Sequence, residues 1–163
     1  MSEAEWISEW FKKAAEDLLA ANHMFYNMQP RLLEIACYHC QQAVEKALKG
    51  FLIVKGIEPP KTHNLNKLCL MCMEYDQLFG EWQDTCRELT AYAASTRYPD
   101  CVEITDEDTY FAIEEADEIY KFCASLAKSL QSEEEVQEVQ EVQEEEEEEE
   151  QVQPEEEPEE EQE

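Results

Sequence analysis

The chain has 163 residues, of which 41 are acidic and 12 are basic, and its formal net charge is −29 at pH 7. This length allows one domain of ordinary size plus an extension. A strongly acidic surface repels phosphates, so the composition argues against non-specific binding of DNA or RNA. The sequence has no run of 18 apolar residues and no apolar signal-peptide core after Met1, so we expect a cytoplasmic protein without a membrane span.

The negative charge is concentrated at the C-terminal end. Residues 131–163 contain 19 glutamates, two prolines, no Lys or Arg, and valine as the only aliphatic residue. Residues 1–130 hold the remaining 22 acidic and all 12 basic residues, or about −10. Because a like-charge segment with so little apolar surface cannot offset its ordering entropy, we predict a folded domain in residues 1–130 and a disordered Glu-rich tail in residues 131–163. The tail is either a solubilising extension or a functional segment that attracts a basic partner or mimics a nucleic acid.

Apolar residues recur at spacings of three and four throughout residues 1–130, and no strand-like alternation occurs. The pattern predicts helices at about 3–27, 31–55 and 79–94, a short helix capped by Thr62 or Asn64, and a last helix that ends near Leu130. Gly56 and the following prolines stop the second helix, and Thr105 with Asp108 resembles a capping box at the start of the last one. The fold class is therefore all-α, an up-and-down antiparallel bundle of about five helices.

Two Cys-x-x-Cys pairs, Cys37/Cys40 and Cys69/Cys72, raise the question of a zinc site. Both pairs lie inside predicted helices without a neighbouring Gly or Pro turn, and their separation is longer than the common zinc-site spacing. Buried cysteines also serve as small apolar residues. We therefore interpret the four cysteines as core packing and expect no metal and no cofactor.

Residues 39–65, which begin within the first pair, read "HCQQAVEKALKGFLIVKGIEPPKTHNL". This stretch resembles the signature of the HEPN domain family, a nucleotide-binding family of higher eukaryotes and prokaryotes. The matching positions are Gln41, Gln42, Ala43, Glu45, Lys46, Lys49, Thr62, His63 and Leu65, and the family's Arg-Tyr-Pro loop appears as Arg97, Tyr98 and Pro99, followed by Asp100. The resemblance covers residues 3–130. It implies a helical bundle that forms homodimers and often pairs with a small nucleotidyltransferase as a toxin–antitoxin system.

Active ribonucleases of this family carry an Arg-x4-6-His motif. Here no histidine follows Arg87 or Arg97, and Arg31 is separated from His39 by seven residues. The motif is absent, which favours a non-catalytic protein. A metal-independent ribonuclease toxin with a degenerate site remains the alternative, as does a plain scaffold that acts through its acidic tail.

The candidate nucleotide-binding residues are Gln42, Lys46, Lys49, His63, Arg97 and Tyr98, and Glu45, Pro99 and Asp100 are candidates for fixing the loop. Lys and Arg would hold phosphate and Tyr98 would stack on the base. The alternatives to nucleotide binding are structural roles. These are a solvated helix face for Gln42, Glu45, Lys46 and Lys49, a cap-region role for His63, and a salt bridge for Arg97. Trp6, Trp10, Phe25, Phe51 and Tyr92 are assigned to the core or to a dimer interface.

Overall fold

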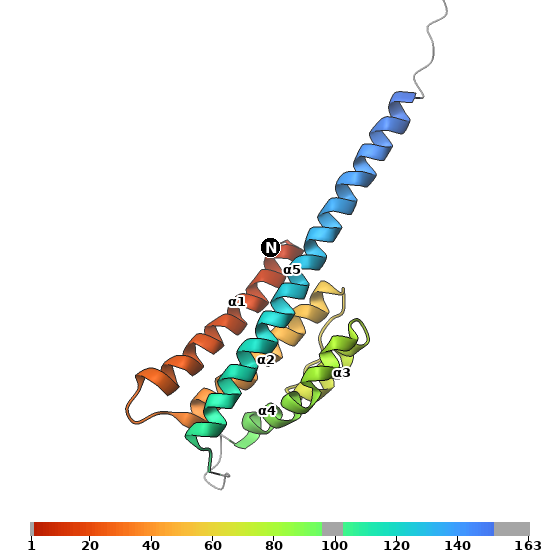
Figure 1. The fold of residues 1–163 in the computed structure, drawn as a ribbon. Helices are drawn as coiled ribbons and strands as arrows, with labels where there is room; N and C mark the ends of the chain where they lie inside the picture. The colour runs from red at the N-terminus through yellow and green to blue at the C-terminus, as the bar shows by residue number, and fades with distance from the viewer. Residues whose placement is uncertain (1, 96–102, 152–163) are drawn as a thin grey trace, which may run out of the picture. The chain divides into compact units, whose positions relative to one another are not determined.

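The computed structural model describes residues 2–95 and 103–151, and every regular element in these two ranges is helical. The elements are α1 (Glu3–Asn22), the π-helical turn η1 (His23–Asn27), α2 (Leu33–Val54), α3 (Leu65–Met73), the 3-10 helix η2 (Gln77–Trp82), α4 (Gln83–Ser95) and α5 (Asp106–Gln151). Figure 1 shows α1 and α2 as an antiparallel pair, with α1 at one edge of the bundle. The predicted helical-bundle fold is confirmed.

Local sequence signals set the ends of several helices. Asn64 caps α3 by accepting from the Lys67 amide at 3.1 Å. Thr105 and Asp108 form the predicted reciprocal pair at the start of α5, with bonds of 2.9 and 3.1 Å. A second capping box joins Ser2 and Glu5 at the start of α1, which the sequence analysis did not identify.

The core is built by α2, which is buried nearly all round between Ala36 and Leu52. On α5, Thr109 contacts Cys37 of α2 through a 3.6 Å Sγ–Oγ1 contact, and Phe122 packs edge-on against Phe79 of η2 at 5.0 Å between ring centroids. Gly50 permits close approach of α1, since a Cβ there would lie 3.0 Å from the Phe11 ring. These contacts place α2 at the centre of the bundle.

The four cysteines of the two Cys-x-x-Cys pairs are fully buried among apolar side chains, where the packing interpretation places them. Burial raises the pKa of the Cys37 thiol and of the Cys40 thiol. Within residues 2–95 and 103–151 no group of three or more His, Cys, Asp or Glu side chains is arranged to hold a metal ion. In the same ranges no helix is long and apolar enough to cross a bilayer.

The chain divides into two compact units, Met1–Lys128 and Ser129–Glu163. The sequence analysis expected disorder from residue 131, and the structure draws α5 as a helix to Gln151, so disorder of the tail stays a prediction. Glu and Gln are good helix formers, and a helix that already exists elongates without a new nucleation cost. Val136, Val139 and Val142 stay more than half exposed, so propensity rather than packing accounts for this helix.

Residues 55–64 join α2 to α3, and we call them the returning segment because they run back along α2. Their last residues lie beside Gln41 and Glu45, near the middle of α2, where the Gln41 Nε2 donates to the His63 carbonyl at 3.3 Å. α3 then proceeds toward the C-terminal end of α2, where Cys72 Sγ donates to the Leu48 carbonyl at 3.7 Å. The connection therefore covers the side of α2 that carries Glu45.

The returning segment begins with a Schellman turn. Gly56 has φ +70°, its amide donates to the Ile53 carbonyl at 2.8 Å, and the Ile57 amide donates to the Leu52 carbonyl at 2.9 Å. A Cβ at position 56 would meet nothing within 4 Å, so only the backbone conformation requires glycine there.

We predict that Gly56→Ala lowers the free energy of unfolding by about 1 kcal/mol, because alanine resists the left-handed conformation. Gly56→Asn is the matched control, since asparagine tolerates that conformation better, and it should cost less than alanine. Urea denaturation followed by circular dichroism measures both values. Equal stability of Gly56→Ala and the wild type would contradict the proposed backbone requirement.

Candidate functional site

A buried carboxylate on α2 is the centre of the candidate site. Glu45 is only 6% exposed, and its two oxygens contact three polar side chains. Lys49 Nζ lies 2.8 Å from Oε1, Gln41 Nε2 donates to Oε2 at 3.0 Å, and His63 Nδ1 lies 3.0 Å from Oε2. We call these four residues the Glu45 network.

Helical spacing accounts for three members of the Glu45 network. Gln41, Glu45 and Lys49 are four residues apart, so their side chains share one face of α2. His63 comes from the returning segment, and its carbonyl accepts a second bond from Gln41. The sequence interpretation of a solvated face is wrong for Glu45 and Lys49, because the returning segment covers them and leaves Lys49 8% exposed.

Electrostatics favours the ionised form of Glu45. Burial raises the pKa of this carboxyl, but hydrogen bonds from Lys49, His63 and Gln41 outweigh burial and hold its pKa below the usual value. Because the pKa of Glu45 is lower in the folded state than in the unfolded chain, the network stabilises the fold. This stabilisation is complete at pH values above the unfolded-state pKa of about 4.3. This contribution is lost as the pH falls through the lower folded-state pKa.

The remaining predicted site residues do not join this network as one group. Lys46 pairs with Asp17 of α1, and Asp17 Oδ1 also lies 2.8 Å from His39 Nδ1. Gln42 Nε2 donates to the Gln41 Oε1 at 2.8 Å and so touches the network only at its edge. The structure therefore separates Lys46 from Lys49, which the sequence analysis had placed in one site.

The loop candidates Arg97, Tyr98, Pro99 and Asp100 lie outside the residues that the structure describes. Arg31 and His39, whose sequence spacing comes nearest to the ribonuclease motif, have different ion-pair partners. Arg31 pairs with Asp106 at 3.2 Å, whereas His39 pairs with Asp17.

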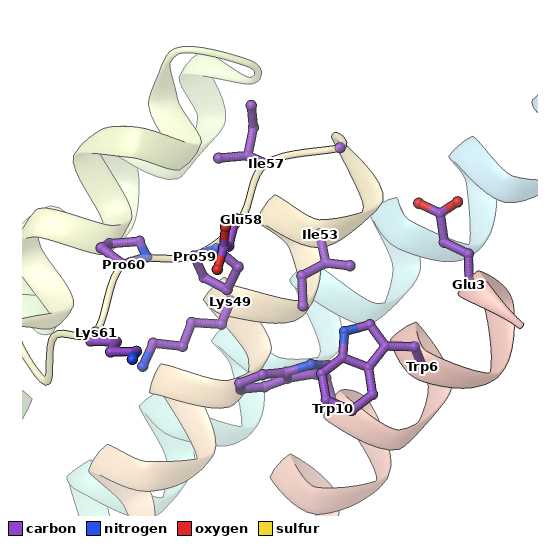
Figure 2. A pocket seen from close by; sticks show the side chains of 11 residues that line it. Glu3, Trp6, Trp10, Lys49, Ile53, Ile57, Glu58, Pro59, Pro60 and Lys61 are labelled. Atoms are coloured by element: carbon purple, nitrogen blue, oxygen red, sulfur yellow. The ribbon is translucent and has the colours of Figure 1, made fainter. Parts of the chain in front are cut away.

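A pocket of about 500 Å³ adjoins the Glu45 network through Lys49. Figure 2 shows its walls: Trp6 and Trp10 come from α1, Lys49 and Ile53 from α2, and Pro59, Pro60 and Lys61 from the returning segment. Glu3, Gly56, Ile57 and Glu58 complete the lining. The volume lies in the range typical of small-molecule sites.

Two tryptophans form the aromatic wall of this pocket. Their ring centroids are 5.9 Å apart and the rings are nearly perpendicular, at 87°. Trp6 is 48% exposed, so it does not belong to the core of the described chain. Trp10 Nε1 is buried, and no described residue accepts a hydrogen bond from it. Exposed aromatic surface beside an unused donor is suited to a flat heteroaromatic ligand.

Sequence reasoning assigned Trp6 and Trp10 to the core or to a dimer interface and did not place either beside Lys49. Their separation of four residues predicted a common face of α1. What the sequence did not indicate is that the returning segment passes close enough to close a pocket over that face. The pair Pro59-Pro60, which forces an extended connection after α2, was the available signal.

The HEPN domain family model matches residues 7–128. The structure of TT1696 from Thermus thermophilus has a TM-score of 0.65 and 24% identity, covering 73% of this chain and 96% of that one. The structure of ST0689, an archaeal HEPN homologue, has a TM-score of 0.60 and 24% identity, covering 74% and 97%. At this identity the two structures show a shared fold. No curated protein matches.

We predict that Glu45→Met lowers the free energy of unfolding by about 3–5 kcal/mol, because it leaves the buried Lys49 ammonium without a counter-charge. The double variant Glu45→Met/Lys49→Met should recover most of this loss, since two apolar side chains replace the ion pair. Denaturant unfolding of the wild type, the two single variants and the double variant gives the four free energies. A double variant less stable than Glu45→Met alone would contradict the role of the ion pair.

Proposed function

Because the chain belongs to the HEPN domain family, we propose that it is a non-catalytic HEPN module that binds a nucleotide in the pocket between α1, α2 and the returning segment. It works as a homodimer and pairs with a protein partner, a small nucleotidyltransferase. The absence of the Arg-x4-6-His spacing from the sequence supports a binding role over a ribonuclease role.

The observation that carries the nucleotide proposal is the joint lining of one pocket by an exposed tryptophan and two lysines. A base stacked on an aromatic ring gains about 1–3 kcal/mol, and any base supplies the flat face that this needs. Trp6 therefore takes the stacking role that the sequence analysis gave to Tyr98. Lys61 and Lys49 lie on the opposite wall, where a phosphate attached to that base can reach an ammonium group.

The Glu45 network holds the cationic wall in place. Lys49 Nζ is fixed by its 2.8 Å contact with Glu45. The contact of His63 with Glu45 anchors the backbone two residues after Lys61. The Lys49 ammonium and the backbone that carries Lys61 are thus positioned before a ligand arrives, which lowers the entropy cost of binding. Of the sequence-predicted ligand residues, Lys49 contacts the ligand in this proposal and His63 acts through the network.

Exposed apolar side chains support a protein partner. Leu19 is 72% exposed and Tyr26 is 50% exposed, and they lie seven residues apart on the continuous helix formed by α1 and η1. Two exposed apolar side chains on one side of a helix are suited to contact with another protein surface.

We predict that AMP and GMP bind the purified full chain, with calorimetry as the measurement. Trp6→Ala should weaken binding by about 5- to 150-fold, corresponding to the loss of one stacked base, and Lys61→Ala should also weaken it. Lys12→Ala is the matched control, because Lys12 pairs with Glu9 on the exposed surface of α1 and does not line the pocket. Absence of binding by both nucleotides, or equal binding by Trp6→Ala and the wild type, would refute the pocket assignment.

We predict a solution mass of twice the 19.1 kDa of one chain, measured by light scattering after size-exclusion chromatography. Light scattering is required because an acidic extension enlarges the apparent size in chromatography alone. A mass of one chain at all concentrations tested would contradict the homodimer.

A further inference from the structure

We propose that the pocket selects nucleoside monophosphates over both nucleoside triphosphates and free nucleosides. This inference rests on the proposed nucleotide site and specifies its ligand class through the charges that line the pocket. Such selection requires that the charges lining the pocket attract one phosphate group and repel any further phosphate groups.

The two lysines of the pocket are not equivalent. Lys49 is already neutralised by Glu45, with 2.8 Å between the ammonium nitrogen and the carboxylate oxygen, and both side chains are at least nine-tenths buried. Lys61 is exposed and has no ion-pair partner within the described ranges. One uncommitted ammonium group therefore faces the pocket, which suits one phosphate.

Two carboxylates also line the pocket. Glu3 stands at the start of α1 and Glu58 lies in the returning segment, and both are exposed. With Glu45 behind Lys49, the immediate surroundings contain three carboxylates and two ammonium groups. A second and third phosphate would find no free cation here and would approach Glu3 or Glu58.

The pocket has several apolar side chains but only one ammonium group without an ion-pair partner among the described residues. Trp6, Ile53 and Pro59 provide surface for a base and a sugar, and the unpartnered Trp10 Nε1 offers a donor to a ligand oxygen or ring nitrogen. Stacking alone would accept a nucleoside, and Lys61 adds an attraction that only a phosphorylated ligand uses. A nucleoside monophosphate can both stack on the tryptophan wall and place its phosphate group beside Lys61.

The body of the protein reinforces this preference. Residues 1–130 carry about −10, so each additional negative charge on a ligand enters an unfavourable field. A triphosphate brings more of this charge than a monophosphate, so the field of the protein disfavours it more strongly.

The test is calorimetric titration of the full chain with adenosine, AMP and ATP, the last with and without Mg²⁺. We expect AMP to bind about five- to tenfold more tightly than ATP, the size expected from one or two screened like-charge contacts, and more tightly than adenosine. ATP binding that equals or exceeds AMP binding, or adenosine binding that equals AMP binding, would overturn this inference while leaving the nucleotide site standing. Absence of binding by all three ligands would instead remove the site itself.

A pair of charge-matched variants separates local from general repulsion. Glu3→Gln/Glu58→Gln removes the two pocket carboxylates, and it should strengthen ATP binding and narrow the difference between AMP and ATP. Glu9→Gln/Glu16→Gln removes the same charge from α1 at residues that pair with Lys12 and Lys13 and do not line the pocket. An equal narrowing in both variants would refute selection by the pocket carboxylates.

Discussion

One buried carboxylate organises the candidate site. Glu45 is covered by the returning segment, and each of its oxygens contacts a nitrogen donor from α2 or from His63. An ionised group at this depth is tolerated only when it is fully paired. Because one of its partners belongs to the returning segment, ionisation of Glu45 is coupled to the path of residues 55–64. That path in turn creates the pocket between α1 and α2.

Local signals made much of the fold predictable. Asn64, Gly56 and the Thr105–Asp108 pair each act on their own backbone within four residues, so the sequence around them contains the whole interaction. For residues 131–151 the sequence analysis favoured disorder over helix because like-charge repulsion was weighted above the strong helix propensity of Glu and Gln.

The candidate site was less predictable because it depends on contacts between distant residues. The sequence analysis grouped Lys46 with Lys49 by their proximity along α2, but Lys46 faces Asp17 while Lys49 faces Glu45. Trp6 was assigned to packing because nothing in α1 alone shows which chain segment lies opposite. Family resemblance marked Glu45 and His63 as significant residues, and only the fold shows that they contact each other.

The proposed pocket is most directly tested by the indole N–H resonances of the three tryptophans in a ¹⁵N-labelled sample titrated with AMP. Trp6 and Trp10 line the pocket, whereas Trp82 lies in η2, where its ring packs against Phe122 at 6.2 Å between centroids and serves as an internal reference. The account predicts that the Trp6 and Trp10 resonances shift with increasing AMP and that the Trp82 resonance stays in place. Shifts confined to Trp82, or no shift at any of the three indoles, would contradict it.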